Sequence, residues 1–345
     1  MRRGGIATWP NLQREMADGA VRLGESRGCG RGVFACRPLE RGEAVLRALP
    51  CALVPNDAAL LTRCAVCLRA DAERCARCDA AALCARCARS GARQIHEDEC
   101  ATLHRLARAP TGDGAGARPS DTRTLRMLIR VLFWRRRAMA GTVADEWWGD
   151  GDVRADGDIE DVLDLAEPPA HLLSDSLRRA FVHTAQQARY LMPADARCGL
   201  ELAASLVGIL YCNSLTIYGE KHEVRVTQPT PSSGLPLFEL VCTRVQEIGV
   251  ALSGSVAMLN HSCEPSASWA IDDDGCVEVR RVSRAGDTTR RPTRLTDARA
   301  NARARALAGA HAARAPPRRG APSLVCRPAP PTERSAGGAA RGILL

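Results

Sequence analysis

The spacing of apolar residues changes several times along this 345-residue chain, and each change predicts a different element. Short apolar runs at residues 33–35 and 44–46 flank a turn-forming stretch at 39–42, so they predict a hairpin. Residues 239–242 and 277–279 are rich in apolar and β-branched residues and predict two later strands.

Between these strands, the apolar period changes to that of helices. Residues 124–134 place apolar side chains at helical spacing with arginines on the other face, and residues 172–191 and 200–211 also predict helices. Residues 109–122 have the composition of a linker. An acidic stretch at 145–161 is similar to a calcium loop, but its carboxylates miss the required alternation, which indicates a solvated loop. Helices and strands together predict an α+β fold.

Residues 64–100 differ from the rest because potential metal ligands replace large apolar residues. Thiolate and neutral imidazole are the ligands that Zn²⁺ prefers, and a two-residue gap lets one turn present two sulfurs to one ion. Eight ligands predict two closed, four-coordinate sites, which are structural because no position is left for water or substrate. The ligands form three CxxC pairs followed by HxxxC: Cys64, Cys67, Cys75, Cys78, Cys84, Cys87, His96 and Cys100.

A disulfide framework is the alternative interpretation of these cysteines, and it would require an oxidising compartment. The first residues contain no apolar run typical of a signal peptide, and no stretch of about 18 apolar residues could span a membrane. We therefore favour zinc, and a location in the nucleus or cytoplasm. The remaining nine cysteines are scattered, mostly among apolar residues, as expected for buried thiols in a reducing compartment.

The positive net charge of +9 comes from one end of the chain. Residues 284–345 hold 13 arginines and three carboxylates, so this segment carries +10 and the remainder of the chain carries −1. The folded part therefore offers no argument for binding nucleic acid. The segment is rich in Arg, Ala, Pro and Gly and has no aromatic residue, which predicts a disordered tail.

Three short motifs surround the zinc ligands. Residues 26–33 read SRGCGRGV, residues 212–217 read CNSLTI, and residues 259–265 read LNHSCEP. The glycine motif alone is weak evidence for a dinucleotide site, because no clear strand-to-helix turn accompanies it. Together with the other two motifs and the eight ligands, it closely resembles the SET-and-MYND family of protein lysine methyltransferases, over roughly residues 20–283.

The resemblance implies a SET-domain β-sheet fold with an inserted MYND-type two-zinc module and a helical insertion. Cys64, Cys67, Cys84 and Cys87 would hold one ion, and Cys75, Cys78, His96 and Cys100 the other. The implied division is an N-terminal SET part at 20–60, the zinc module at 61–105, a linker and helical insertion at 106–210, the SET core at 211–283 and the tail at 284–345.

The methyl donor of the family is S-adenosylmethionine. The resemblance places its pocket at Gly30, Arg31, Asn213, Asn260 and His261. Glycines let a ligand approach the backbone, and an asparagine offers both a donor and an acceptor. Taken singly, Asn213 could instead cap a helix and His261 could stabilise a turn.

The sequence departs from the family pattern in several places. The third cysteine pair is CxxC where the family usually has CxxxC, and Ser266 stands where asparagine usually follows the proline. The family motif GExxxxxY corresponds to residues 286–293, where no tyrosine occurs; Tyr190, Tyr211 and Tyr218 all precede Asn260. A later CxCxxC cluster that would hold a third zinc with Cys263 is also missing. A shifted reading frame or a retained intron near Arg284 would explain both losses, and a diverged tail is the alternative.

Two functions follow from these observations. The first is methyl transfer from S-adenosylmethionine to a lysine of a histone or another protein, impaired in this chain. The second is an inactive, zinc-scaffolded module that binds short peptides. Neither requires a membrane or direct contact with nucleic acid.

Overall fold

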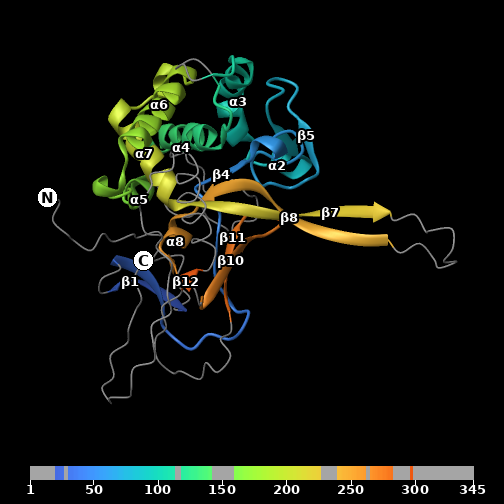
Figure 1. Ribbon diagram of the computed structural model, residues 1–345, viewed down its shortest axis with the longest axis vertical. Coiled ribbons are helices and arrows are strands. Elements are labelled where there is room, and N and C mark those ends of the chain that lie inside the picture. Colours follow the sequence, from blue (N-terminus) through green and yellow to red (C-terminus); the bar gives the residue numbers. More distant parts are fainter. Residues whose placement is uncertain are drawn as a thin grey trace, which may run out of the picture.

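The computed structural model describes residues 20–26, 30–112, 118–141, 159–226, 239–261, 265–282 and 296–297. Within these residues, the long helices gather on one side and most strands lie on the other (Figure 1). The cysteine-rich segment, residues 64–100, lies beside the helices. The mixture of helices with mostly antiparallel strands is consistent with the predicted α+β class.

The helices form where apolar residues recur at helical spacing. Four are long: α3 (Arg93–Arg108), α4 (Arg123–Met139), α6 (Asp175–Leu191) and α7 (Leu200–Asn213). The short ones are α2 (Ala85–Arg89), α5 (Ile159–Leu163), α8 (Gly254–Ala257) and the 3-10 helices Asp57–Ala59, Ala170–Leu172 and Ala194–Ala196. The three predicted helices are confirmed by α4, α6 and α7. Helix α6 begins at Asp175 because the Ser174 hydroxyl accepts from the Leu177 N–H at 3.2 Å and caps it.

The described strands form four sheets. Strands β1 (Val21–Ser26) and β2 (Gly30–Ala35) form one antiparallel pair, and β5 (Ala72–Arg74) and β6 (Ala82–Cys84) form another. A third sheet has the order β4 (Ala52–Pro55), β8 (Glu239–Leu252), β7 (Ser214–Val226). The fourth has the order β3 (Ala44–Ala48), β11 (Val277–Arg281), β10 (Ala267–Ile271), β12 (Thr296–Asp297), β9 (Asn260–His261). The predicted strands at 239–242 and 277–279 are confirmed by β8 and β11.

The predicted hairpin between residues 33–35 and 44–46 is wrong. Strand β2 pairs with β1, whereas β3 pairs with β11. The turn itself forms, with Gly42 at φ +79°, but the Gly42 N–H donates to the Arg281 carbonyl of β11 at 2.9 Å. A turn signal marks where the chain reverses and does not select the strand that pairs next.

Helix α4 is the centre of the main core. Its apolar residues from Leu125 to Trp134 are all buried and pack with residues of α6, α7, β4 and β8. The arginine face is buried too, since Arg126, Arg130 and Arg137 each keep less than a tenth of their surface exposed. The helix face that the sequence pattern marks as polar is therefore buried against other parts of the protein.

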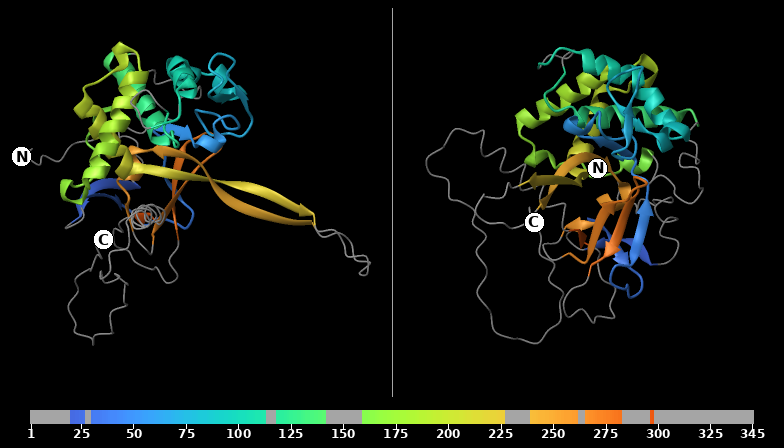
Figure 2. Two further views of the ribbon diagram at one scale, coloured as in Figure 1. Left: turned by 45° about the horizontal axis from the view of Figure 1, so that its top comes forward. Right: turned by 90° about the vertical axis from the view of Figure 1, so that its right-hand side faces the viewer.

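The β7–β8 hairpin extends away from the rest of the molecule, as two further views show (Figure 2). In the segment predicted to be a disordered tail, the structure describes one element, β12, which lies between β9 and β10. The acidic stretch before Ile159 and the remainder of the tail lie outside the described residues. Among the described helices, none combines the length and the apolar character that crossing a membrane requires.

Candidate zinc and cofactor sites

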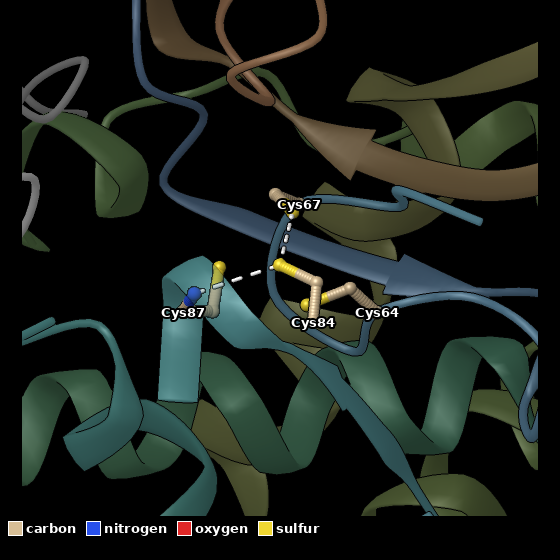
Figure 3. A group of neighbouring side chains, drawn as sticks. All are labelled: Cys64, Cys67, Cys84 and Cys87. Carbon is tan, nitrogen blue, oxygen red and sulfur yellow. Dashed lines mark hydrogen bonds between the residues drawn. The ribbon is translucent and has the colours of Figure 1, made fainter. Parts of the chain in front are cut away.

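Four buried cysteines form the first candidate metal site. Figure 3 shows Cys64, Cys67, Cys84 and Cys87 pointing toward one another, and their sulfurs all lie within 4.8 Å of each other. Cys64 and Cys67 lie on one turn. Cys84 ends β6 and caps α2, and its sulfur accepts from the Cys87 N–H at 3.5 Å. The short spacing of this third pair therefore does not keep its two sulfurs apart.

Cys75, Cys78, His96 and Cys100 form the second group, also within 4.8 Å of one another. Helix α3 contributes His96 and Cys100, which are four residues apart and therefore share one helix face. The structure thus divides the eight side chains as the family resemblance implied, with the first and third pairs together.

The first two CxxC turns are built alike. In each, the residue after the second cysteine has a left-handed backbone, with φ +65° at Leu68 and +52° at Asp79. Its N–H donates to the carbonyl of the first cysteine, at 3.0 Å to Cys64 and 2.9 Å to Cys75. Such tight turns direct both sulfurs to one side, which is what a shared ion requires.

The distances within both groups fit zinc. A tetrahedral zinc with bonds of about 2.3 Å to sulfur places its sulfurs about 3.8 Å apart. The Cys67 and Cys84 sulfurs are 3.6 Å apart, and the Cys75 and Cys100 sulfurs are 3.9 Å apart. The His96 Nε2 atom lies 3.8 Å from the Cys78 sulfur. Each group could hold one zinc ion.

The protonation of these groups also suits a metal. Burial lowers the pKa of His96, which favours the neutral imidazole that binds zinc. In the first group, the hydrogen bond from Cys67 lowers the pKa of Cys64 to about 2, whereas the bond to Cys64 raises the pKa of Cys87. Burial raises the pKa of Cys78 to about 12. A thiolate is thus strongly favoured at Cys64, and a bound cation would stabilise the others.

A buried arginine joins the two groups to the main core. The Arg130 guanidinium on α4 donates to both carboxylate oxygens of Glu99, at 2.7 and 2.8 Å, and both side chains are almost fully buried. It also donates to the Ala65 carbonyl at 2.7 Å and to the Leu53 carbonyl of β4. Ala65 lies within the first CxxC turn, and Glu99 lies between the two α3 ligands, so one side chain binds segments that carry ligands of both groups.

The predicted cofactor residues come from three distant segments. Gly30 and Arg31 begin β2, Asn213 ends α7, and Asn260 and His261 form β9. The Asn260 side-chain amide donates to the Arg31 carbonyl at 2.9 Å, which joins two of the segments directly. The side chain of His261 lies outside the described residues.

Residues 164–166, which follow α5, connect Asn213, the third of these segments, with Arg31. The Arg31 guanidinium donates to the Asp164 carboxylate at 2.5 Å and to the Asp164 carbonyl at 2.6 Å. Two residues later, the Ala166 carbonyl accepts from the Asn213 amide at 2.8 Å. The same amide donates to the Ile209 carbonyl at 2.8 Å, so Asn213 also caps the C-terminal turn of α7, as the alternative interpretation suggested. Sequence reasoning missed Asp164 and Ala166, and no motif marks them.

This arrangement leaves groups that a ligand could use. The side-chain amides of both asparagines donate to protein carbonyls. Within the described residues, no hydrogen bond uses the side-chain oxygen of Asn213 or Asn260. Two such acceptors suit a ligand that carries an ammonium group. Gly30 is exposed with φ +66°, and apart from its chain neighbours no atom of the described residues lies within 4 Å of the position a Cβ would take. Its backbone is therefore open to a ligand.

A groove of about 550 Å³ lies between the cysteine-rich segment and the β7–β8 pair. Its lining includes the apolar side chains of Leu68, Ile217 and Ile248, together with the charged side chains of Arg63 and Asp273. Strand β7 is the edge strand of its sheet, and residues 217–219 of this strand line the groove.

Comparison with known proteins finds two histone-lysine methyltransferases. The chain is 27% identical over 126 residues to histone-lysine N-methyltransferase ASHR1 of Arabidopsis thaliana, which covers 36% of this chain and 25% of that protein. It is 20% identical over 264 residues to histone-lysine N-methyltransferase Smyd1 of Mus musculus, which covers 76% of this chain and 45% of that protein. The chain therefore spans less than half the length of either relative. No family model matches it.

At this level the chain is distantly similar to histone-lysine methyltransferases. The match to the mouse protein covers most of this chain, so the similarity is not confined to one motif. Two further parts of the family pattern, Cys263 and residues 286–293, lie outside the described residues. Of the three tyrosines, Tyr211 packs on Phe181 with ring centroids 5.4 Å apart, while Tyr190 and Tyr218 are exposed.

Proposed function

We propose that this protein is an S-adenosylmethionine-dependent methyltransferase that acts on lysine side chains of proteins. The observation that carries the proposal is the convergence of three predicted cofactor segments. Arg31, Asn213 and Asn260 are far apart in the sequence, yet a hydrogen-bonded path through residues 164–166 links them. The low-identity similarity to two histone-lysine methyltransferases supports the same activity.

The residues present fit the cofactor. S-adenosylmethionine would supply a methyl group on a sulfonium, and its amino-acid end carries an ammonium and a carboxylate. The side-chain oxygens of Asn213 and Asn260, which accept no hydrogen bond from the described residues, would accept from the ammonium. The exposed backbone at Gly30 would allow close approach of the ligand. His261, adjacent to Asn260, completes the set that the family resemblance implies.

We also propose that the cysteine-rich segment is a MYND-type module with two structural zinc ions, inserted into a SET-type body. The buried positions of seven of the eight ligands support structural sites, since a closed site leaves no room for substrate. The role of the ions would be to hold residues 64–100 against α4, where Arg130 binds Ala65 and Glu99 beside ligands of both groups.

The edge of β7 offers a route for a protein substrate. This strand starts at Ser214, directly after Asn213, and its residues 217–219 line the groove. Apart from the ladder with β8, no hydrogen bond within the described residues involves Ile217, Tyr218 or Gly219. An extended peptide from a histone or another protein would add to this edge, and would bring a lysine toward Asn213.

The direct test has two steps, binding and transfer. We expect S-adenosylhomocysteine to bind the full chain in calorimetry, and a radiolabelled methyl group to pass slowly to histones or to proteins of a cell extract. Transfer should be slow because residues 286–293 lack the tyrosine that aligns the substrate in the family. A variant with a family-like sequence after Gly286 should transfer faster. If neither the natural chain nor this variant binds S-adenosylhomocysteine, the proposal is wrong.

A second function is supported by the groove beside the cysteine-rich segment. Its mixed apolar and charged lining would suit a short peptide even without methyl transfer. Peptide binding that survives in Asn260→Ala, with no detectable S-adenosylhomocysteine binding by the natural chain, would favour this interaction module over the enzyme.

A further inference from the structure

The β1–β2 hairpin carries Gly30 and Arg31, and it is a weakly supported element. Its two strands pair only with each other within the described residues, and an isolated two-stranded hairpin is at best marginally stable in water. Its base is anchored, since Val21 and Val33 are buried in the main core. The described residues at its other end include no such anchor, since Glu25 and Gly30 are exposed.

Arg31 supplies the hydrogen bonds that hold this end. Within the described part of the chain, every hydrogen bond that joins Glu25, Gly30 or Arg31 to another element involves Arg31. The Arg31 carbonyl accepts from Asn260, and the Arg31 guanidinium donates twice to Asp164. Two contacts on Asp164 restrict the guanidinium more than a single bond would.

Asp164 is itself fixed by the core. It follows α5 and precedes Leu165, and its N–H donates to the Glu160 carbonyl at 3.0 Å. Val162 and Leu165, on either side, are 1% and 4% exposed. The same short segment holds Asn213 through the Ala166 carbonyl. Asp164 is therefore a rigid support between a marginal hairpin and the end of α7.

We propose that Asp164 is a positioning residue for the cofactor. It holds Arg31, and thereby keeps the Gly30 end of the β1–β2 hairpin in a fixed position relative to Asn213 and Asn260. This inference rests on the proposed methyltransferase function. Arg31 and Asp164 are 35% and 49% exposed, and an exposed ion pair contributes little to the stability of a fold. The effect of this pair should therefore fall on ligand affinity.

The test compares Asp164→Asn with a matched exposed pair elsewhere. Asp195, which is 66% exposed and accepts from Arg136 at 3.1 Å, provides the control Asp195→Asn. Calorimetry with S-adenosylhomocysteine on the full chain should show weaker binding by Asp164→Asn, with a dissociation constant about tenfold larger. This is expected if about a tenth of the molecules keep the hairpin in place. Asp195→Asn should bind like the natural chain, and both variants should melt close to it.

Two further measurements separate positioning from general destabilisation. The KM for S-adenosylmethionine should rise in Asp164→Asn while the KM for the protein substrate stays unchanged, and Asp164→Glu should recover part of the affinity. Equal affinity in Asp164→Asn and the natural chain would overturn the inference and leave the proposed function standing. So would an affinity loss matched by a large fall in melting temperature. No S-adenosylhomocysteine binding by the natural chain would reject both.

Discussion

The two candidate sites are assembled in different ways. The eight candidate zinc ligands lie on two similar turns, the end of β6, one short helix and one long helix within residues 64–100, and their sulfurs and imidazole converge through local geometry. The cofactor residues lie between positions 30 and 261, and side-chain bonds to backbone carbonyls bring them together. The first site would depend on a bound metal ion, and the second depends on how distant segments pack.

This difference predicts where each site is vulnerable. In the cysteine-rich segment, cysteine accounts for much of the two small buried clusters, so bound metal would take the place of a larger apolar core. Around Arg31, the bonds are exposed and individually weak. Metal loss should therefore unfold one region, whereas single substitutions at the other should mainly change ligand affinity.

The largest effect should come from removing the metal. Purified protein should contain about two zinc ions per chain, measured by mass spectrometry of the metal, and a strong chelator should unfold residues 64–100. Structural zinc contributes roughly 10–16 kcal/mol to folding of small zinc peptides, far more than any one side chain here.

Cysteine substitutions provide the control for metal loss. Cys64→Ser should lower the zinc content, whereas Cys276→Ser should not, since Cys276 is buried outside both groups and its burial raises its pKa to about 12. Protein that contains no zinc and keeps its melting temperature in chelator would contradict both zinc sites.

The next effect should come from the buried pair that links the segment to α4. Glu99→Ala would leave the Arg130 charge buried without its carboxylate, which typically costs about 3–5 kcal/mol. Denaturant unfolding should show this loss together with weaker zinc retention. The double variant Glu99→Leu with Arg130→Met should recover much of the stability, because it removes both charges. A loss in the double variant larger than the sum of the single losses would contradict this account of the pair.

The zinc ligands could be predicted from the sequence because their spacing is local. A CxxC turn and an i, i+4 helix pair fix the directions of the ligands with little help from the rest of the fold. Helix α4 was predicted for the same reason, since its period is visible within one segment. The partners of its arginine face could not be predicted, because Glu99 and Ala65 lie in other segments of the chain.

Long-range pairing was the part that the sequence could not determine. The turn at residues 39–42 gave no indication that β3 would pair with β11, which lies over two hundred residues later. Asp164 follows the acidic stretch and belongs to no motif, so its contact with Arg31 becomes visible only when α5 is placed beside β2. Asn213 and Asn260 were predicted from a family resemblance. Only the structure shows that their side-chain oxygens accept no hydrogen bond from the described residues.

A smaller effect should follow from Asn260→Ala. The change removes the amide that holds the Arg31 carbonyl and the oxygen proposed to accept from the cofactor. Losing a partly buried hydrogen-bonding group costs about 1–3 kcal/mol when its partners are left unsatisfied, so the affinity for S-adenosylhomocysteine should fall roughly 5- to 150-fold in calorimetry. Gln94→Ala, which removes an exposed hydrogen bond to Asp98 on α3, should leave the affinity unchanged. Equal affinities in both variants would remove Asn260 from the cofactor site.

The smallest change in stability should come from Gly30→Ala. Gly30 has φ +66°, and a Cβ there would meet no atom within 4 Å, so the cost is that of a left-handed backbone alone, about 1 kcal/mol. Gly42 is its matched control, with φ +79° and the same open surroundings.

Denaturant unfolding of Gly30→Ala and Gly42→Ala should therefore show similar small losses of stability. The two variants should differ in ligand affinity, because only the methyl group at residue 30 would enter the space proposed for the cofactor. Weaker S-adenosylhomocysteine binding in Gly30→Ala alone would separate a ligand contact from backbone strain. Equal binding by both variants would instead place the ligand away from β2.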